Sequence, residues 1–342
     1  MVVGNPDALS QVARNRYDDE IYARFRETAE ILTNSNWDSF VNTEQFCALR
    51  NGHAQQLSIH SILKPQVLID FASVTMTSAN FCDGLIYKLW GKMGVKFVED
   101  VSLTKDLRFQ DHCNGPSTTI KYLTDLPWSQ RLMARKNDFD EEDGPTVESA
   151  FIEAVKTEFG EQRFLWQVNK SVTTDPFGGN AKRLPNVPHG LNDYSEFDRI
   201  CFLSALNPKT DHFKFLESRG LSSNDVRQAV YCSAVYQSVM RSSIRDPNNM
   251  NPKTVIVPDV HAAKYLRKLF PGSRIEKLKT QISEQPVIVG RPREYKSDAE
   301  RTASHRQRKK LKKLKNIVQT ASFRPYPSRT VVVQSNHQAK KM

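Results

Sequence analysis

Between Thr146 and Val289, short apolar runs alternate with amphipathic stretches, and this alternation constrains the fold more than any other feature. The apolar runs are rich in Val, Ile, Leu and Phe, which is typical of strands that are buried on both faces. Strands that alternate with helices predict an α/β fold with a parallel, doubly wound sheet. The expected helices are 147–159, 208–219 and 260–270, and the expected strands are 164–168, 199–206, 254–257 and 287–289.

One long helix is expected over 222–247, because the segment opens with a good N-cap serine and closes at an Asp-Pro dipeptide. Gln237, Arg241 and Arg245 recur every four residues, so a helix would place them on one face. Two rigidly held guanidinium groups suit a triphosphate or a nucleic-acid backbone, since each can bind phosphate oxygens in a bidentate way. The alternative is a surface helix that merely carries two arginines.

Residues 1–140 are interpreted as a partial first lobe of mixed structure. The run Val74–Thr77 suits a buried strand, and the small residues Ser78, Ala79 and Asn80 follow at its exit, where open α/β sheets bind ligands. The acidic run 138–144 is interpreted as an exposed linker that separates this lobe from a second lobe, 146–289. The other expected elements are helices at 17–34 (with Ile21, Phe25 and Ala29 inward), 40–49 and 83–94, a helix leading into a strand over 57–71, and a strand at 95–97.

Four segments, taken in order, resemble motifs of superfamily-two helicases of the DEAD/DEAH type. Gln237-x-x-x-Arg241-x-x-x-Arg245 resembles the motif whose glutamine and arginines reach the γ-phosphate of the nucleotide from the neighbouring lobe. The sequence Gly190-Leu191-Asn192-Asp193 resembles the motif that senses the nucleotide and touches the nucleic-acid backbone.

The other two segments extend the resemblance toward the N-terminus. Phe164–Lys170 stands where the second lobe of these helicases begins its nucleic-acid contacts. Thr77-Ser78-Ala79-Asn80 resembles the Ser-Ala-Thr segment that couples hydrolysis to strand movement, with Asn80 where threonine is usual. The resemblance implies a RecA-like second lobe over 146–289, with Arg241 and Arg245 as γ-phosphate sensors, Gln237 as their orienter and Gly190–Asn192 as a coupling loop.

The sequence also departs from the helicase pattern. It contains no Gly-x-x-x-x-Gly-Lys-Ser/Thr loop, whose backbone N–H groups and lysine hold phosphates, and no apolar strand that ends in Asp-Glu to hold Mg²⁺. We therefore expect the C-terminal part of a helicase-like protein, either truncated or split from its ATP-binding lobe. ATP and Mg²⁺ are expected only with that lobe, and the isolated chain is expected not to hydrolyse ATP.

The net charge of +11 lies in the C-terminal tail. Residues 290–342 carry 15 Lys/Arg against 3 Asp/Glu, whereas residues 1–289 carry 34 against 35. A near-neutral body with a cationic arm indicates a nucleic-acid partner, with DNA favoured over RNA. The alternative is a solvated tail that aids solubility.

Within this tail, Gly290-Arg291-Pro292-Arg293 resembles the core of an AT-hook, in which proline holds two arginines extended along a narrow A·T minor groove. A capping box at 297–300 then predicts a helix over 299–315 that is frayed until phosphates neutralise it, and the remainder of the tail is expected to be disordered. The nucleic-acid-binding residues expected in the tail are Arg291, Arg293, Arg306, Arg308, Lys309, Lys310, Lys312 and Lys313.

Other chemistry is sparse in this sequence. The five cysteines form no Cys-x-x-Cys pair and the eight histidines show no metal-ligand spacing, so no metal site is expected and a reducing cytoplasm is favoured. No apolar run approaches the ~20 residues of a membrane helix, and no signal peptide opens the chain, so no membrane partner is expected. Two other functions remain open: a non-enzymatic DNA-binding accessory factor of a replication or mobile-element (plasmid or phage) system, and a small-molecule enzyme, for which no catalytic constellation is visible.

Overall fold

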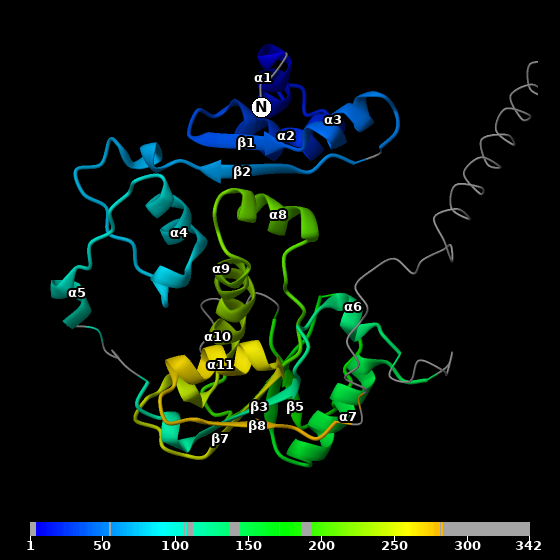
Figure 1. Cartoon of the computed structure of the whole chain (residues 1–342), viewed down its shortest axis with the longest axis vertical. Helices are drawn as coiled ribbons and strands as arrows, with labels where there is room; N and C mark the ends of the chain where they lie inside the picture. The colour runs from blue at the N-terminus through cyan, green and yellow to red at the C-terminus, as the bar shows by residue number, and fades with distance from the viewer. Residues whose placement is uncertain are drawn as a thin grey trace, which may run out of the picture. The chain divides into compact units, whose positions relative to one another are not determined.

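The structure is a computed structural model that describes residues 5–282, apart from gaps at 55, 106, 108–111, 137–143, 171, 186–192 and 281 (Figure 1). The expected strand 287–289, the loop residues Gly190, Leu191 and Asn192, and the whole basic tail with its eight expected DNA-binding residues lie outside the described part. Two names are used below: the N-terminal region is residues 5–107, and the sheet domain is residues 112–282.

A six-stranded parallel sheet forms the centre of the sheet domain, in the order β5-β4-β6-β7-β3-β8. The parallel α/β architecture expected from the sequence is therefore confirmed. The strands are β3 (Thr118–Thr124), β4 (Phe164–Gln167), β5 (Ala181–Arg183), β6 (Arg199–Phe202), β7 (Lys253–Asp259) and β8 (Arg274–Lys277).

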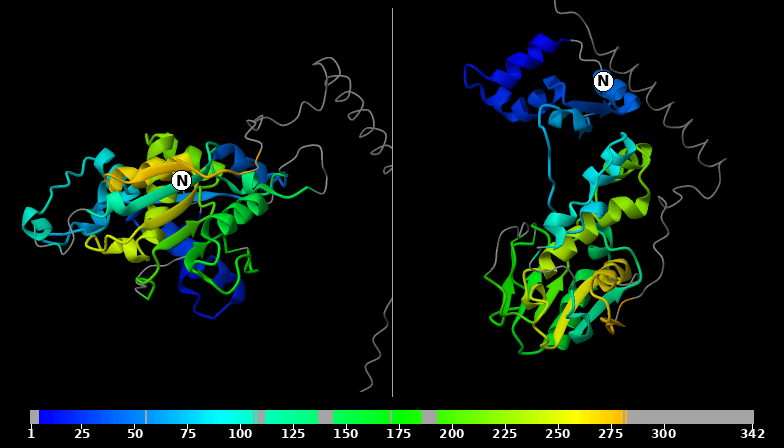
Figure 2. Two further views of the ribbon diagram at one scale, coloured as in Figure 1. Left: turned by 90° about the horizontal axis from the view of Figure 1, so that it is seen from below. Right: turned by 90° about the vertical axis from the view of Figure 1, so that its left-hand side faces the viewer.

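Helices cover both faces of this sheet because the chain moves in opposite directions along it. From β3 the chain crosses past β7 and β6 to β4, and after β6 it turns back toward β7. Because crossovers between parallel strands are right-handed, the first direction puts α7 on one face of the sheet, and the second puts α10 and α11 on the other face. Both groups are visible around the strands in Figures 1 and 2. The helices are α7 (Val147–Phe159), α10 (Ser233–Val239) and α11 (Val260–Leu269).

The main core of the sheet domain is a large hydrophobic cluster built on strands that are apolar on both faces. Leu165, Ile200 and Ile256, on three neighbouring strands, are all fully buried. Trp128, in the loop after β3, stacks on Phe151 of α7 with ring centroids 4.8 Å apart. Both side chains are completely enclosed, so the turn after β3 is part of the core rather than a surface loop.

Three of the six strands, β3, β5 and β8, were not expected from the sequence. β3 lies in a stretch that we expected to be irregular, and it pairs with both β7 and β8. The sheet domain therefore begins well before the lobe boundary expected near residue 140. β5 and β8 are only three and four residues long and lie at the sheet edges, where short strands are common and leave little periodicity in the sequence.

The N-terminal region contains only a two-stranded sheet, in which β1 and β2 pair antiparallel with Trp37 opposite Leu63. The expected helices over 17–34 and 83–94 are confirmed as α2 and α4, whereas residues 95–97 form no strand. Its elements are α1 (Pro6–Arg14), α2 (Glu20–Thr33), β1 (Trp37–Val41), α3 (Thr43–Arg50), β2 (Ile59–Leu63), α4 (Leu85–Lys92) and α5 (Val101–Lys105).

The strand expected at Val74–Thr77 is absent. Residues 72–79 form neither helix nor strand and are mostly exposed, and Figure 2 shows this stretch as an extended trace without an arrow. The order expected over 57–71 is also reversed, since β2 comes first and a short 3₁₀ helix, Pro65–Leu68, follows. A strand needs a neighbour for its backbone hydrogen bonds, and none of the described residues offers one to this run.

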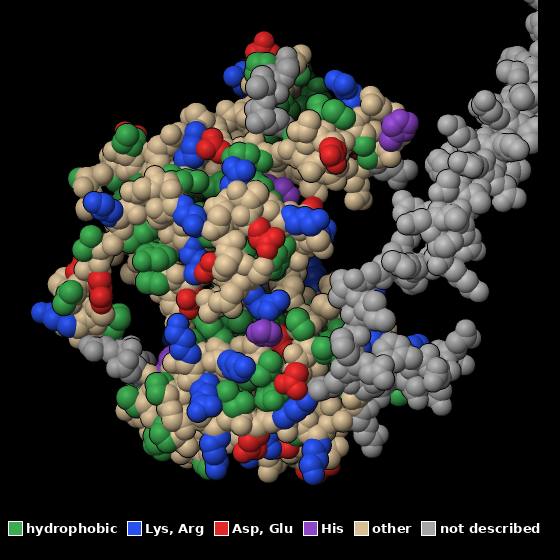
Figure 3. Space-filling view, in the orientation of Figure 1, with side chains coloured by type: hydrophobic (Ala, Val, Ile, Leu, Met, Phe, Trp, Pro, Cys, Tyr) green, Lys and Arg blue, Asp and Glu red, His purple; other side chains and the backbone are tan. Residues whose placement is uncertain are grey.

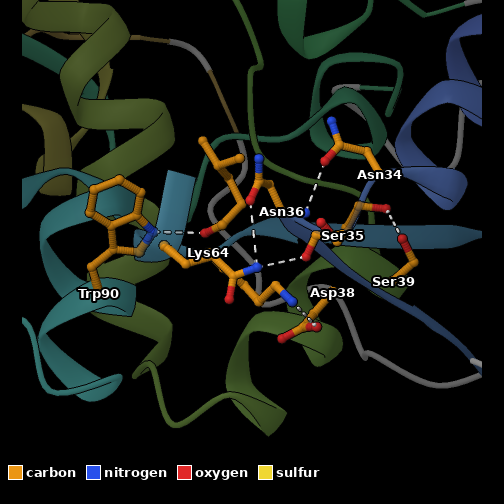
Figure 4. A network of polar contacts seen from close by, with 10 residues as sticks. Asn34, Ser35, Asn36, Asp38, Ser39, Lys64 and Trp90 are labelled. Carbon is orange, nitrogen blue, oxygen red and sulfur yellow. Dashed lines mark hydrogen bonds and ion pairs between the residues drawn. The ribbon is translucent and has the colours of Figure 1, made fainter. Parts of the chain in front are cut away.

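Polar contacts, rather than a large core, hold the pair of strands β1 and β2 (Figure 4). The indole N–H of Trp90 donates to the Leu63 carbonyl at 2.7 Å, which ties α4 to β2. The hydroxyls of Ser39 and Ser61 lie 2.8 Å apart across the strand pair, and Lys64 lies 3.4 Å from Asp38. Partly exposed polar pairs of this kind contribute little each, so the two strands are weakly stabilised by these contacts.

The apolar side chains of the N-terminal region are largely exposed. On α2 only Ala29 is buried, whereas Ile21 is 66% and Phe25 is 58% exposed, contrary to the inward face expected from the helical pattern. The space-filling view shows hydrophobic side chains at the surface over the α4 and α5 segments (Figure 3). Of the fifteen large hydrophobic side chains exposed among the described residues, fourteen belong to residues 17–107.

α4 joins the N-terminal region to the sheet domain. Its Lys88 lies 2.5 Å from Asp225, which also forms a capping box with Ser222 at the start of α9 (Ser223–Arg227). Leu85 and Leu89 of the same helix pack on a small cluster formed by Leu216, Leu221 and Val226. None of the described helices is both long and apolar enough to cross a bilayer.

Candidate functional site

The long helix expected over 222–247 is confirmed only in part: helical backbone runs without a break from Ser223 to Val239, through one π-helical turn, and stops before Arg241. α9 ends at Arg227, one π-helical turn covers Gln228–Cys232, α10 ends at Val239, and a 3₁₀ turn covers Ser243–Arg245. Gln237, Arg241 and Arg245 therefore do not share one face of a continuous helix. We call residues 240–246 the arginine turn.

Hydrogen bonds of the Ser242 side chain explain why the helix stops after Val239. The backbone of Ser242 is extended, and its hydroxyl donates to the Val239 carbonyl at 2.8 Å while it accepts from the Ile244 N–H at 3.5 Å. Serine side chains that bond to nearby backbone groups compete with the helical hydrogen-bond ladder. The Ser242-Ser243 pair is thus the local signal for the break, and it is visible in the sequence.

The arginine turn is pinned to the sheet domain at several points. The Ser243 N–H donates to the Phe197 carbonyl at 3.0 Å, and the Ser243 hydroxyl donates to Asp198. The side-chain amide of the fully buried Asn114 donates to the carbonyls of Ile244 and Asp246, both at 2.9 Å. These bonds fix the backbone on both sides of Arg245.

Close packing next to Asn114 reinforces the arginine turn. A Cβ on Gly115 would lie 1.9 Å from the Pro271 carbonyl oxygen, so the chain can approach only at glycine. On the other side, the buried ammonium of Lys253 donates to the carbonyls of Asn249 and Asn251 at 2.6 and 2.7 Å. The loop that leads from the arginine turn into β7 is therefore held as firmly as the turn itself.

These contacts place the arginine turn at the amino ends of the strands. Phe197 and Asp198 directly precede β6, Asn114 precedes β3, and Lys253 begins β7. As γ-phosphate sensors of the helicase type, Arg241 and Arg245 should lie at the carboxyl edge of the sheet, where open α/β folds bind ligands. That expectation is wrong, and a nucleotide bound at the carboxyl edge of this sheet would not meet Arg245.

The two guanidinium groups of the arginine turn differ in exposure but influence each other. Arg245 is exposed, whereas Arg241 is half-buried. Burial, and then the positive charge of Arg245, lower the pKa of Arg241. Gln237 is half-buried on α10, while its neighbour Ser238 points inward and donates to Gln167 of β4 at 2.5 Å. The turn thus concentrates positive charge on a fixed backbone.

The other expected site residues are not brought to this place by any described contact. Thr77, Ser78 and Ala79 are exposed in the strand-free stretch, and Asn80 adopts a left-handed conformation before a short 3₁₀ helix. Asp193 is exposed in a turn. The other residues of the expected coupling loop, 190–192, lie outside the described residues. The expected DNA-binding residues of the tail lie outside them as well.

Sequence reasoning missed a buried polar network at the carboxyl edge of the sheet. The backbone N–H of Trp128 donates to Asp259 at 2.9 Å, and its indole N–H donates to the Leu203 carbonyl at 2.8 Å. Asn169 accepts from the Ala205 N–H at 2.7 Å, which joins the ends of β4 and β6. These bonds bury Trp128 completely beside the carboxyl ends of β4, β6 and β7.

Buried titratable groups beside this network are held in their neutral form. Burial and the nearby Asp259 raise the pKa of Tyr231, and the same two causes raise the pKa of Cys232 to about 12. A thiol with so high a pKa is not a nucleophile at neutral pH. Within the described ranges no group of three or more His, Cys, Asp or Glu side chains is arranged to hold a metal ion.

Comparison with known proteins identifies no relative from which the function of this site could be inferred. The chain matches no protein-family model, no curated protein and no solved structure.

Proposed function

We propose that this chain is a nucleic-acid-binding module of the superfamily-two helicase type, and that it supplies an arginine pair to an ATP-binding lobe whose phosphate loop is not in this sequence. The observation that carries the proposal is the arginine turn. Its backbone is held by the side chain of Asn114 and by the bonds of Ser243 to Phe197 and Asp198, and Arg245 is exposed beside Arg241. The six-stranded parallel sheet is consistent with a RecA-like lobe.

The position of the arginine turn supports a phosphate site on another lobe. Because it lies at the amino ends of the strands, the arginines are far better placed for a site on another lobe than for a nucleotide bound by their own sheet. An arginine that completes a neighbouring site needs a fixed backbone and a surface position, and Arg245 has both. A phosphate group would also relieve the repulsion that lowers the pKa of Arg241.

The exposed apolar side chains of the N-terminal region favour a missing neighbour. Phe25, Phe71 and Val98 are among the large side chains that have no core to enter within the described chain. Exposed apolar surface on this scale is typical of a protein–protein or interdomain contact. We propose that the ATP-binding lobe covers it, whether that lobe is a separate subunit or another part of a longer protein.

Nucleic-acid binding is assigned to the tail, on its charge alone. Residues 290–315 carry 11 Lys/Arg against 3 Asp/Glu. If about six of these cations meet phosphates of duplex DNA, log K should fall with log salt at a slope of about −5. Arg291→Ala and Arg293→Ala should remove a preference for A·T-rich sites, whereas Lys312→Ala should weaken binding to all sequences alike.

The competing proposal is a non-enzymatic DNA-binding accessory protein, in which the arginine turn contacts a nucleic-acid backbone. Its placement away from the carboxyl edge is the observation that favours this alternative. Both functions predict no ATP hydrolysis by the isolated chain, because arginines alone do not assemble a phosphoryl-transfer site. Nucleic-acid-stimulated turnover that Arg245→Ala abolishes would contradict both.

Inorganic tripolyphosphate distinguishes the two proposals, because it carries the terminal phosphate that a γ-phosphate sensor meets. We would follow the guanidinium N–H signals of Arg241 and Arg245 by NMR in the full chain, with Arg274 of β8 as the control. The helicase-type proposal predicts that both signals shift together, with a Kd on the order of millimolar, and that Arg245→Ala removes the response of Arg241. A response to duplex DNA but not to tripolyphosphate would support the accessory protein.

A further inference from the structure

A cleft of about 800 Å³ lies away from the arginine turn, where β1 and β2 meet α4 and α8 (Thr210–Ser218). Its volume falls within the range of small-ligand sites, and its lining is mainly apolar with a few polar groups, as such sites require. The apolar floor is formed by side chains such as Leu89 and Trp90 of α4. The carboxyl-edge network and the arginine turn contribute nothing to this lining.

A stack of rings forms one wall of the cleft. The imidazole of His60 lies parallel to the ring of Phe215, with centroids 4.6 Å apart and an interplanar angle of 11°. His212 continues the stack on His60 at 5.5 Å and 22°. Trp37, half-buried on β1, also lines the space. Flat aromatic faces at the wall of a cleft favour a flat aromatic ligand.

The edges of these rings are available for hydrogen bonds. Neither the imidazole ring of His60 nor that of His212 is hydrogen-bonded to another residue in the part of the chain that the structure describes, although both residues are half-buried. Burial, and then the charge of His60, lower the pKa of His212, so its ring is neutral at pH 7 and offers one donor and one acceptor. Asp211, which is exposed and accepts from the Ser58 hydroxyl at 2.5 Å, also lines the cleft and makes its own side of the opening unfavourable for a phosphate.

We propose that this cleft binds a nucleobase, which stacks on His212 at the end of the ring stack, since both faces of His60 are already covered by Phe215 and His212. A base is a flat ring, and the imidazole of His212 and the indole of Trp37 are flat surfaces that line the cleft. Lys209, exposed at the rim, is placed to meet the phosphate that follows the base. The inference rests on the cleft alone and stands whether or not the chain completes an ATPase site.

Photocrosslinking of the full chain tests this proposal directly. One probe is an oligothymidylate with a single 5-iodouracil, and the other is the free 5-iodouracil mononucleotide, with the crosslinked residue mapped by mass spectrometry. We expect crosslinks on Trp37, His60 or His212. Crosslinks from both probes would identify a nucleotide site, and crosslinks from the oligonucleotide alone would identify a site for a base within a single strand. Crosslinks that map only elsewhere, such as the basic tail, would overturn the proposal.

A matched pair of histidine variants provides the second readout. His212→Ala should lower the crosslinking yield in the cleft at least about fivefold, the effect of losing one stacking partner. His261→Ala, on α11, is the control and should leave the yield unchanged. Because the contact is made to an uncharged base, the yield in the cleft should also depend less on salt than binding by the tail does. Equal yields from the two variants, with both folded by circular dichroism, would contradict the proposal.

Discussion

The sheet domain and the N-terminal region differ in where their apolar side chains lie. Of the forty hydrophobic residues that are buried among the described residues, only Ala29, Ile62 and Trp90 belong to the N-terminal region. The sheet domain encloses nearly all of its large hydrophobic side chains, whereas the N-terminal region leaves fourteen at the surface. The first is a domain with its own core, and the second behaves as one layer of a structure that needs another.

Topology explains this difference. A parallel sheet must be covered on both faces, and the crossovers that connect its strands supply α7, α10 and α11 for that purpose. The sheet of the N-terminal region has only β1 and β2 among the described residues, and a two-stranded sheet is at best marginally stable unless it packs against further elements. A sequence can therefore carry strong apolar runs in both regions and still complete a core in only one.

The largest expected effect comes from a matched pair of phenylalanines. Phe202→Ala removes a fully buried ring from β6 and should lower the free energy of unfolding by about 3–5 kcal/mol. Phe25→Ala, on the exposed face of α2, should change it by no more than about 0.5 kcal/mol. Urea denaturation of the two variants measures the difference. Comparable losses in both would mean that the N-terminal region has a core of its own.

The next effect tests the support of the arginine turn. Asn114→Leu keeps the volume but leaves the carbonyls of Ile244 and Asp246 without their donor, so we expect a loss of about 2–3 kcal/mol. Asn248→Ala, at an exposed position in the following loop, serves as the control and should be neutral. An Asn114→Leu variant as stable as the parent in thermal melts would show that the arginine turn is not held from β3.

A smaller, pH-dependent effect tests the joint between the two regions. Bonds from Lys88 and Ser222 lower the pKa of Asp225 to about 2, below the 3.8 expected in the unfolded chain. Its stabilisation is therefore present above about pH 4 and is lost as the pH falls toward 2. Asp225→Asn should lower the free energy of unfolding by about 1–2 kcal/mol at pH 7, because solvent screens this partly exposed ion pair. Near pH 2 the substitution should have no effect on the free energy of unfolding.

Urea denaturation of parent and variant over this pH range measures that difference. A gap between the two proteins that persists at pH 2 would exclude an ionic joint between Lys88 and Asp225.

The sequence predicts the elements whose pattern is local. α7, β4, β7 and α11 lie close to their expected ranges, because each is an apolar run or an amphipathic period bounded by turn residues. β3 was missed although Thr118–Thr124 is rich in β-branched residues, since its role depends on pairing with β7, more than 120 residues later in the sequence. A single sequence carries no local signal for pairing between strands that are so far apart along the chain.

The candidate site was less predictable than the fold. The spacing of Gln237, Arg241 and Arg245 predicts one helix face, but the helix ends at Val239, before both arginines. The arginine turn is fixed at the amino edge of the sheet by tertiary contacts. The side chain of Asn114 bonds to the Ile244 carbonyl, and Asp198 accepts from the Ser243 hydroxyl. The nucleobase cleft likewise combines His60 and His212, which are 152 residues apart in the sequence and show no motif.

Hydrogen exchange followed by mass spectrometry tests the central contrast most directly, because it reports local stability along the whole chain. The account predicts that amides in α2, β1 and β2 exchange within about minutes at neutral pH, whereas those in β4, β6 and β7 stay protected for about hours. Adding a lobe that covers the N-terminal region should slow exchange in the first group only. Equal protection of the two groups in the isolated chain would contradict the claim that the N-terminal region lacks a core of its own.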